Sequence, residues 1–116
     1  MDDILKKALD FSNYNQTLNI QRKSAKEKYS SKMIVGHAGG LFNIDRELIV
    51  FVQMLINQNR IENIPLIDSN NNPVMIKDMQ VFRDEIFDRS FSATLEYYNE
   101  YEKIKKSRSV EKLVDL

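Results

Sequence analysis

The sequence contains no cysteine and no tryptophan, and 116 residues include only one histidine, two prolines and three glycines. Without cysteine the chain can form no disulfide, thiol nucleophile or zinc–thiolate site. The single histidine, His37, excludes any site within one chain that requires two imidazoles. The longest apolar run, residues 48–56, is much shorter than the roughly 20 residues of a membrane-spanning helix. These absences exclude many chemistries, so the sequence says more about architecture and partners than about a reaction.

Charged residues are abundant but balanced, with 17 Lys and Arg against 17 Asp and Glu. A chain with 42% hydrophobic and 29% charged residues is typical of a folded soluble protein. Its length fits a single domain, residues 1–116. The opening Met1–Asp3 is acidic where a secretory signal would be basic and then apolar. We therefore expect a soluble, intracellular protein with no membrane partner.

The spacing of apolar residues predicts a long helix at the start of the chain. The first 35 residues contain neither glycine nor proline. Apolar side chains recur between Ile4 and Tyr29 at steps of three, four and seven, which is the spacing of one helix face. The pattern predicts one helix over about 3–32. A shorter first helix, ending at the weak helix formers Ser12 and Asn13, is the alternative.

Two β-hairpins are predicted in the middle of the chain. The run Met33–Ile44 has two β-prone segments around Gly39–Gly40, and these glycines can supply the positive φ of a tight turn. Residues 64–67 and 74–76 form the second pair of β-prone segments. Pro65 has no backbone N–H, so we expect either that its strand lies at a sheet edge or that Pro65 is among the first residues of the strand.

Two more helices complete the predicted fold. Apolar spacing predicts one over 47–57 and a longer one from Met79 to about Ser107, with Asp45 and Asp78 as their N-caps. The fold class is therefore α+β in the order helix–hairpin–helix–hairpin–helix. We expect one small antiparallel sheet packed by the long N- and C-terminal helices, with these two helices against each other.

The last predicted helix has two apolar stripes rather than one. The first comprises Met79, Phe82, Ile86, Ala93, Tyr97, Tyr101 and Ile104, and the second comprises Phe87, Phe91, Leu95 and Tyr98. Two apolar stripes exceed what packing against a single layer requires. Either one stripe meets the sheet and the other the N-terminal helix, or the surplus stripe contacts another subunit. We predict the second stripe to be a protein-interaction surface.

Three groups of residues resemble reactive or ligand-binding sites, but each has a simpler structural explanation. The loop Gly36–Gly40 lacks the Gly-Lys-Ser/Thr of a phosphate-binding loop. No motif pairs His37 with a nucleophile and an orienting carboxylate. Asp68–Asn72 begins like a calcium loop, but Pro73 and Met79 occupy the positions of its glycine and its bidentate glutamate. We therefore predict a non-enzymatic protein with no catalytic, cofactor or metal site, and leave open whether His37 or this turn has a role.

Charge is unevenly distributed along the chain. Residues 22–32 and 103–108 each carry a net charge of +4, whereas residues 40–102 carry −6. The two basic segments together could bind phosphates, although basic residues near a helix C-terminus also complement the helix dipole. A nucleic-acid-binding accessory protein is thus the alternative function, and its candidate residues are Arg22, Lys23, Lys26, Lys105, Lys106 and Arg108.

Several strings taken together carry a resemblance to a known group of proteins. They lie at residues 8–14, 17–18, 21–23, 39–44, 67–74, 92–98 and 106–110. In this order they resemble small uncharacterised proteins of T-even-like tailed bacteriophages, notably marine ones, over nearly the whole chain. The resemblance brings no assigned activity or binding residues. It implies a phage-infected bacterial cell, with a location in the host cytoplasm or the virion. The expected partner is a second copy or another phage protein, and the expected role is that of a structural component of the virion or of particle assembly.

Overall fold

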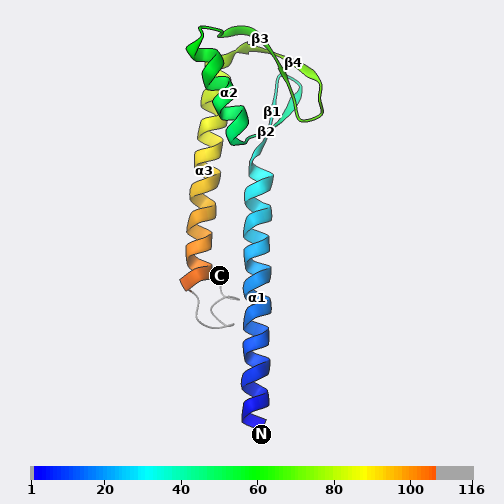
Figure 1. The fold of residues 1–116 in the computed structure, drawn as a ribbon, viewed down its shortest axis with the longest axis vertical. Helices are drawn as coiled ribbons and strands as arrows, with labels where there is room; N and C mark the ends of the chain where they lie inside the picture. Colours follow the sequence, from blue (N-terminus) through cyan, green and yellow to red (C-terminus); the bar gives the residue numbers. More distant parts are fainter. Residues whose placement is uncertain (1, 107–116) are drawn as a thin grey trace. The chain divides into compact units, whose positions relative to one another are not determined.

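The structure is a computed structural model that describes residues 2–106 (Figure 1). Within that range the chain is α+β, which confirms the predicted class. The elements in order are α1 (Asp2–Lys32), β1 (Ile34–His37), β2 (Gly40–Asn43), α2 (Arg46–Asn57), β3 (Glu62–Ile67), β4 (Pro73–Asp78) and α3 (Met79–Lys106).

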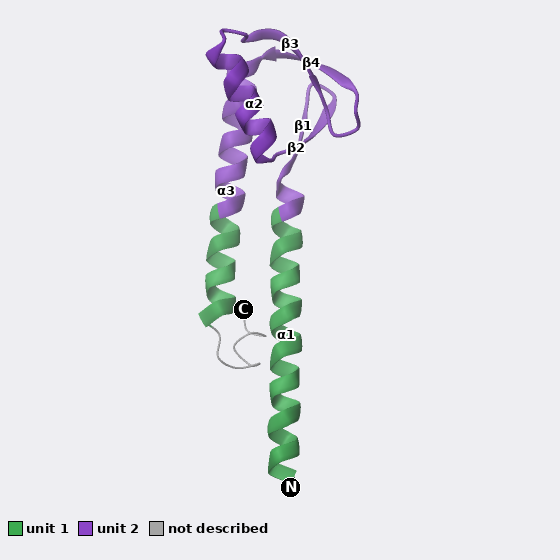
Figure 2. Cartoon of the chain, in the orientation of Figure 1, with its two compact units in different colours: residues 1–29, 95–116 green, residues 30–94 purple. Residues whose placement is uncertain are grey.

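The chain forms two compact units, coloured separately in Figure 2. Unit 1 comprises residues 1–29 and 95–116, and unit 2 comprises residues 30–94. Unit 2 therefore contains both hairpins, α2 and the first half of α3, while unit 1 contains most of α1 and the second half of α3.

The four strands form two separate antiparallel sheets of two strands each, so the predicted single sheet is wrong. In the first sheet Ile34 pairs with Asn43, and in the second Glu62 pairs with Asp78. The two hairpins meet at the tip of the second one rather than along their strands. There the backbone N–H of Ser69 donates to the Leu41 carbonyl oxygen at 2.8 Å, and the Ser69 hydroxyl donates to the same oxygen at 2.6 Å.

Unit 2 has a compact apolar core drawn from both hairpins and two helices. Its fully buried side chains include Phe42 of β2, Val52 of α2, Ile76 of β4 and Phe82 of α3. Within unit 2 the two sheets are packed by α2 and the first turns of α3.

Capping by aspartate fixes the starts of the two helices in unit 2. The Asp45 carboxylate accepts a hydrogen bond from the Leu48 backbone N–H at 2.8 Å. The Asp78 carboxylate accepts bonds from the backbone N–H groups of Gln80 and Val81 at 3.0 and 3.2 Å. These three bonds satisfy first-turn N–H groups that have no partner within the helix, so both predicted N-caps are confirmed.

Unit 1 is a pair of helices, formed by most of α1 and the second half of α3. Ala25 and Ile104 are its buried residues in the described range, and Tyr14, Leu18 and Tyr97 pack around them. The Tyr29 and Tyr97 rings stack with centroids 4.9 Å apart, and Lys28 Nζ lies 3.4 Å from the Glu96 carboxylate. The two long helices thus lie against each other as expected, and α1 continues unbroken through Ser12 and Asn13.

Candidate functional site

The second apolar stripe of α3 is exposed along its whole length. Phe87, Phe91, Leu95 and Tyr98, referred to below as the α3 stripe, are between 37% and 72% exposed. They recur at steps of three and four, so they follow one side of the helix. Asp84 and Asp88 are exposed beside Phe87 and provide a polar border at this end.

The first apolar stripe of α3 serves both intramolecular contacts. Phe82 and Ile86 belong to the core of unit 2, whereas Tyr97 and Ile104 pack against α1 in unit 1. The first stripe therefore makes both contacts: its early residues pack against the hairpins in unit 2, and its later residues pack against α1 in unit 1. Neither the core of unit 2 nor that of unit 1 includes a residue of the α3 stripe within residues 2–106. The interpretation in which one stripe contacts the sheet and the other contacts the N-terminal helix is therefore wrong.

The basic residues of the nucleic-acid alternative lie in unit 1. Arg22, Lys23 and Lys26 are exposed on α1, and Lys105 and Lys106 are exposed in the last turn of α3. Arg108 lies outside the described residues. Nearby, Lys28 is 3.4 Å from Glu96 and 4.0 Å from Glu100, so acidic side chains of α3 offset part of the positive charge of α1.

The single histidine connects β1 to α3 within unit 2. His37 Nδ1 lies 3.0 Å from the Glu85 carboxylate, and the imidazole ring lies 4.8 Å from the Phe82 ring. These contacts hold the half-buried imidazole against a carboxylate and an aromatic ring. They fix the position of the strand on the helix, and no nucleophilic side chain is among its hydrogen-bond partners in the described residues.

Asp68 organises the asparagine-rich turn between β3 and β4. Its buried carboxylate accepts hydrogen bonds from the backbone N–H groups of Asn72 at 2.8 Å, Asn70 at 3.0 Å and Leu41 at 3.2 Å. Asn71 adopts a positive φ of 62°, which asparagine tolerates well. The carboxylate oxygens are therefore engaged by the backbone, and no group of three or more metal-ligating side chains occurs within residues 2–106.

These hydrogen bonds make the stability of the protein dependent on pH. The bond from the Asn72 N–H lowers the pKa of Asp68 below its ordinary value of 3.8, helped by the Leu41 and Asn70 N–H groups and opposed by burial. A lowered pKa in the folded state means that ionised Asp68 favours folding. Its contribution is complete above pH 3.8 and is lost as the pH falls through the folded pKa.

We therefore expect Asp68→Asn to lower the Tm by several degrees at pH 7, and the difference from the original protein to shrink below pH 3.8. Thermal unfolding followed by circular dichroism, once at pH 7 and once below pH 3.8, measures the difference in Tm between the two proteins. Asp84→Asn is the matched control, because the Asp84 side chain is 66% exposed and pairs with the neighbouring Arg83. An equal Tm loss at both pH values would contradict the assignment of the effect to the Asp68 charge.

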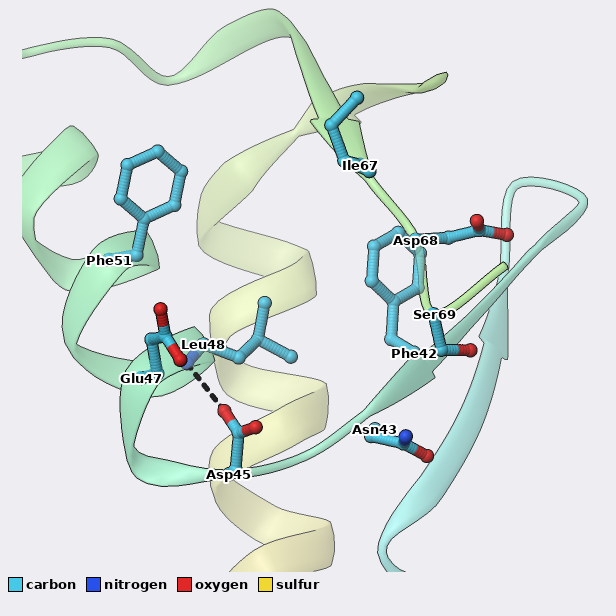
Figure 3. Close-up of a pocket in the computed structure, with 9 residues that line it drawn as sticks. All are labelled: Phe42, Asn43, Asp45, Glu47, Leu48, Phe51, Ile67, Asp68 and Ser69. Atoms are coloured by element: carbon cyan, nitrogen blue, oxygen red, sulfur yellow. Dashed lines mark hydrogen bonds between the residues drawn. The ribbon is translucent and has the colours of Figure 1, made fainter. Parts of the chain in front are cut away.

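A hollow of about 450 Å³ lies where α2 begins, close to both hairpins (Figure 3). Phe42, Leu48 and Phe51 supply apolar surface, and Asp45, Glu47 and Asp68 supply carboxylates. The Asp45 and Asp68 carboxylates already accept backbone hydrogen bonds. The hollow therefore combines apolar surface with three carboxylates, two of which are held by the backbone.

Sequence reasoning missed one exposed surface, at the start of α1. Every residue from Asp2 to Asn13 is exposed, including the large apolar side chains Ile4, Leu5, Leu9 and Phe11. The sequence pattern placed Ile4 and Phe11 on one apolar face of the helix, together with Leu18 and Ala25. The spacing of apolar residues does not indicate how far α3 extends along α1. It therefore could not show that these side chains are exposed.

In comparisons with protein-family models, curated proteins and solved structures, no match to the chain is found. Among residues 2–106, no helix has the length and apolar character needed to cross a membrane.

Proposed function

We propose that the chain is a non-enzymatic protein-interaction or structural component, and that the α3 stripe is its docking surface. The observation that carries the proposal is the exposure of four large apolar side chains on one side of a helix whose other stripe, apart from the half-buried Tyr97 and the exposed Tyr101, is already buried. Their exposed fractions correspond to roughly 500 Å² of surface, which is the size of the largest apolar patches found on soluble monomers.

The chemistry of the α3 stripe fits a protein partner. Aromatic residues are enriched where binding energy is concentrated in protein interfaces, and three of the four residues are aromatic. The exposed Asp84 and Asp88 provide the polar border that such interfaces have at their edge. The resemblance to phage proteins supports a setting in the virion or in particle assembly, with another phage protein as the partner.

Photo-crosslinking tests this proposal. Benzoylphenylalanine at position 91, in a chain produced in bacteria infected by a T-even-like phage, should give a discrete adduct that mass spectrometry identifies. Position 92 is the matched control, because Ser92 is also exposed but lies about 100° further around α3. Absence of an adduct at position 91, or equal adducts at both positions, would contradict the proposal.

A further inference from the structure

The hollow at the start of α2 lies beside an exposed apolar side of that helix (Figure 3). At about 100° per residue, four side chains of α2 fall within one 100° arc, namely Glu47, Val50, Phe51 and Met54. The three apolar members are 46% to 62% exposed. Glu47 and Phe51 line the hollow, whereas Val50 and Met54 do not. Exposed apolar surface therefore continues along the helix beyond the hollow.

The walls of the hollow are held in place by contacts within unit 2. On one side, the Asp45 carboxylate accepts the Leu48 backbone N–H and fixes the start of α2. On the other side, Asp68 and Ser69 both bond to the backbone of Leu41, which holds the turn after β3 on β2. The hollow is therefore pre-formed. Its volume of about 450 Å³ lies within the range of ligand pockets, roughly 300–1,000 Å³.

The lining of the hollow carries only negative charge. Three of its nine residues are acidic, and none of the nine is lysine, arginine or histidine. The Asp68 side chain is turned toward the first hairpin, where it accepts the Leu41 N–H (Figure 3). Asp45 uses one carboxylate oxygen in the helix cap, and the Glu47 carboxylate makes no hydrogen bond or ion pair with another described residue. Two carboxylates therefore retain acceptor capacity for a positively charged group.

The side chain of arginine matches this combination of groups. A guanidinium group binds a carboxylate through two parallel hydrogen bonds and stacks on aromatic rings. Glu47 supplies the carboxylate and Phe51, one helical turn further along α2, supplies the ring, and both line the same hollow. The aliphatic stem of an arginine side chain packs well on apolar surface, which Leu48 and Ile67 provide here.

We infer that the hollow, together with Val50 and Met54, is a docking site for an arginine-bearing segment of another protein. It is named the α2 site below. A small organic cation would fill the hollow alone, whereas a protein segment would also cover Val50 and Met54 with the apolar residues next to its arginine. The α2 site shares no residue with the α3 stripe and does not depend on the function proposed for that stripe.

Binding of a short peptide to the full chain tests the α2 site. The probe is acetyl-Leu-Arg-Leu-amide, and the measurement is the change in NMR chemical shifts of the isotope-labelled chain. The backbone signals of Glu47 and Phe51 should move on titration. The matched control peptide has citrulline in place of arginine, which keeps the shape and removes the charge. It should bind at least about tenfold more weakly, because charge-assisted hydrogen bonds are lost.

Glu47→Gln tests whether the charge acts at the hollow. This variant should weaken binding of the arginine peptide at least about fivefold. The matched control Glu62→Gln removes the same charge from an exposed residue of unit 2 that does not line the hollow, and should change binding less than about twofold. Circular dichroism verifies that both variants remain folded. Equal weakening by the two variants, or no binding of the arginine peptide, would overturn the inference.

The kind of occupant is tested separately. Acetyl-arginine-amide lacks the apolar neighbours and should bind at least about tenfold more weakly than the tripeptide, because it leaves Val50 and Met54 uncovered. Met54→Gln should weaken binding of the tripeptide only. Equal binding of the two probes would assign the hollow to a small cation and overturn the inference. Sedimentation equilibrium gives the other outcome, since a dimer that Glu47→Gln dissociates would assign the α2 site to a second copy and also overturn it.

Discussion

Replacement of Phe82 by alanine is expected to lower the free energy of unfolding by about 3–5 kcal/mol. Phe82 is fully buried at the start of α3, where its ring lies 5.1 Å from the Phe42 ring and 4.8 Å from the His37 ring. Removing the ring takes away packing between α3 and the first hairpin and leaves a cavity. Because a typical domain is stable by about 5–15 kcal/mol, this variant loses a large part of its stability. Urea denaturation followed by circular dichroism measures the loss.

Phe91→Ala is the matched control for this experiment. It makes the same replacement in the same helix, but Phe91 is 72% exposed. Its free energy of unfolding should change by no more than about 0.5 kcal/mol. A loss at Phe91 as large as that at Phe82 would mean that the α3 stripe maintains the fold, and the docking surface would then have to be abandoned.

The helices could be predicted closely because their signals are local. The spacing of apolar residues predicted helices over 3–32 and from Met79 to about Ser107, and the described helices span Asp2–Lys32 and Met79–Lys106. The N-caps Asp45 and Asp78 are also local, since each bonds to N–H groups within three residues. Such contacts depend on neighbouring residues alone and are visible in a short stretch of sequence.

The arrangement of the hairpins could not be predicted because it depends on a few distant contacts. The sequence suggested two hairpins but not which edges would meet. Leu41 donates to the Asp68 carboxylate and accepts from Ser69, so 27 and 28 residues separate the partners. No periodic pattern encodes this connection, and the structure has two sheets where one was expected.

The exposure of the α3 stripe and of the start of α1 also could not be predicted from the sequence. Periodicity identified the α3 stripe but left open whether it was covered by the same chain. On α1 the pattern from Ile4 to Tyr29 predicted one continuous apolar face, without indicating which part of it is covered. Within residues 2–106, the packing of α3 on α1 reaches about as far as Leu18 and Tyr14. The extent of a partner helix is a tertiary property, which explains why the exposed start of α1 was missed.

The close approach of the two hairpins at Gly40 leads to the second large expected effect. A Cβ added at Gly40 would lie 2.5 Å from Val74 Cγ2 and 3.2 Å from both Val74 Cγ1 and the Phe42 ring. Gly40 is buried, so the added methyl group cannot turn into solvent. Gly40→Ala should therefore lower the free energy of unfolding by about 1–3 kcal/mol through overpacking.

Gly36→Ala separates this steric effect from the general cost of replacing a strand glycine. The nearest atom to a Cβ at Gly36 is the Gly40 carbonyl oxygen at 3.9 Å, an ordinary contact distance. Alanine suits a strand better than glycine by roughly 0.5–1 kcal/mol, so this variant should be neutral or slightly stabilising. Urea denaturation compares the two variants.

Val74→Ala should partly rescue Gly40→Ala, because it removes the methyl groups that the new Cβ meets. In a double-mutant cycle the double variant should be more stable than the sum of the two single losses predicts, by about 0.5–3 kcal/mol. Additive losses would mean that Val74 does not limit the space at Gly40. In that case the junction of the two hairpins would depend on the hydrogen bonds of Asp68 and Ser69 to Leu41 rather than on close packing of β2 against β4.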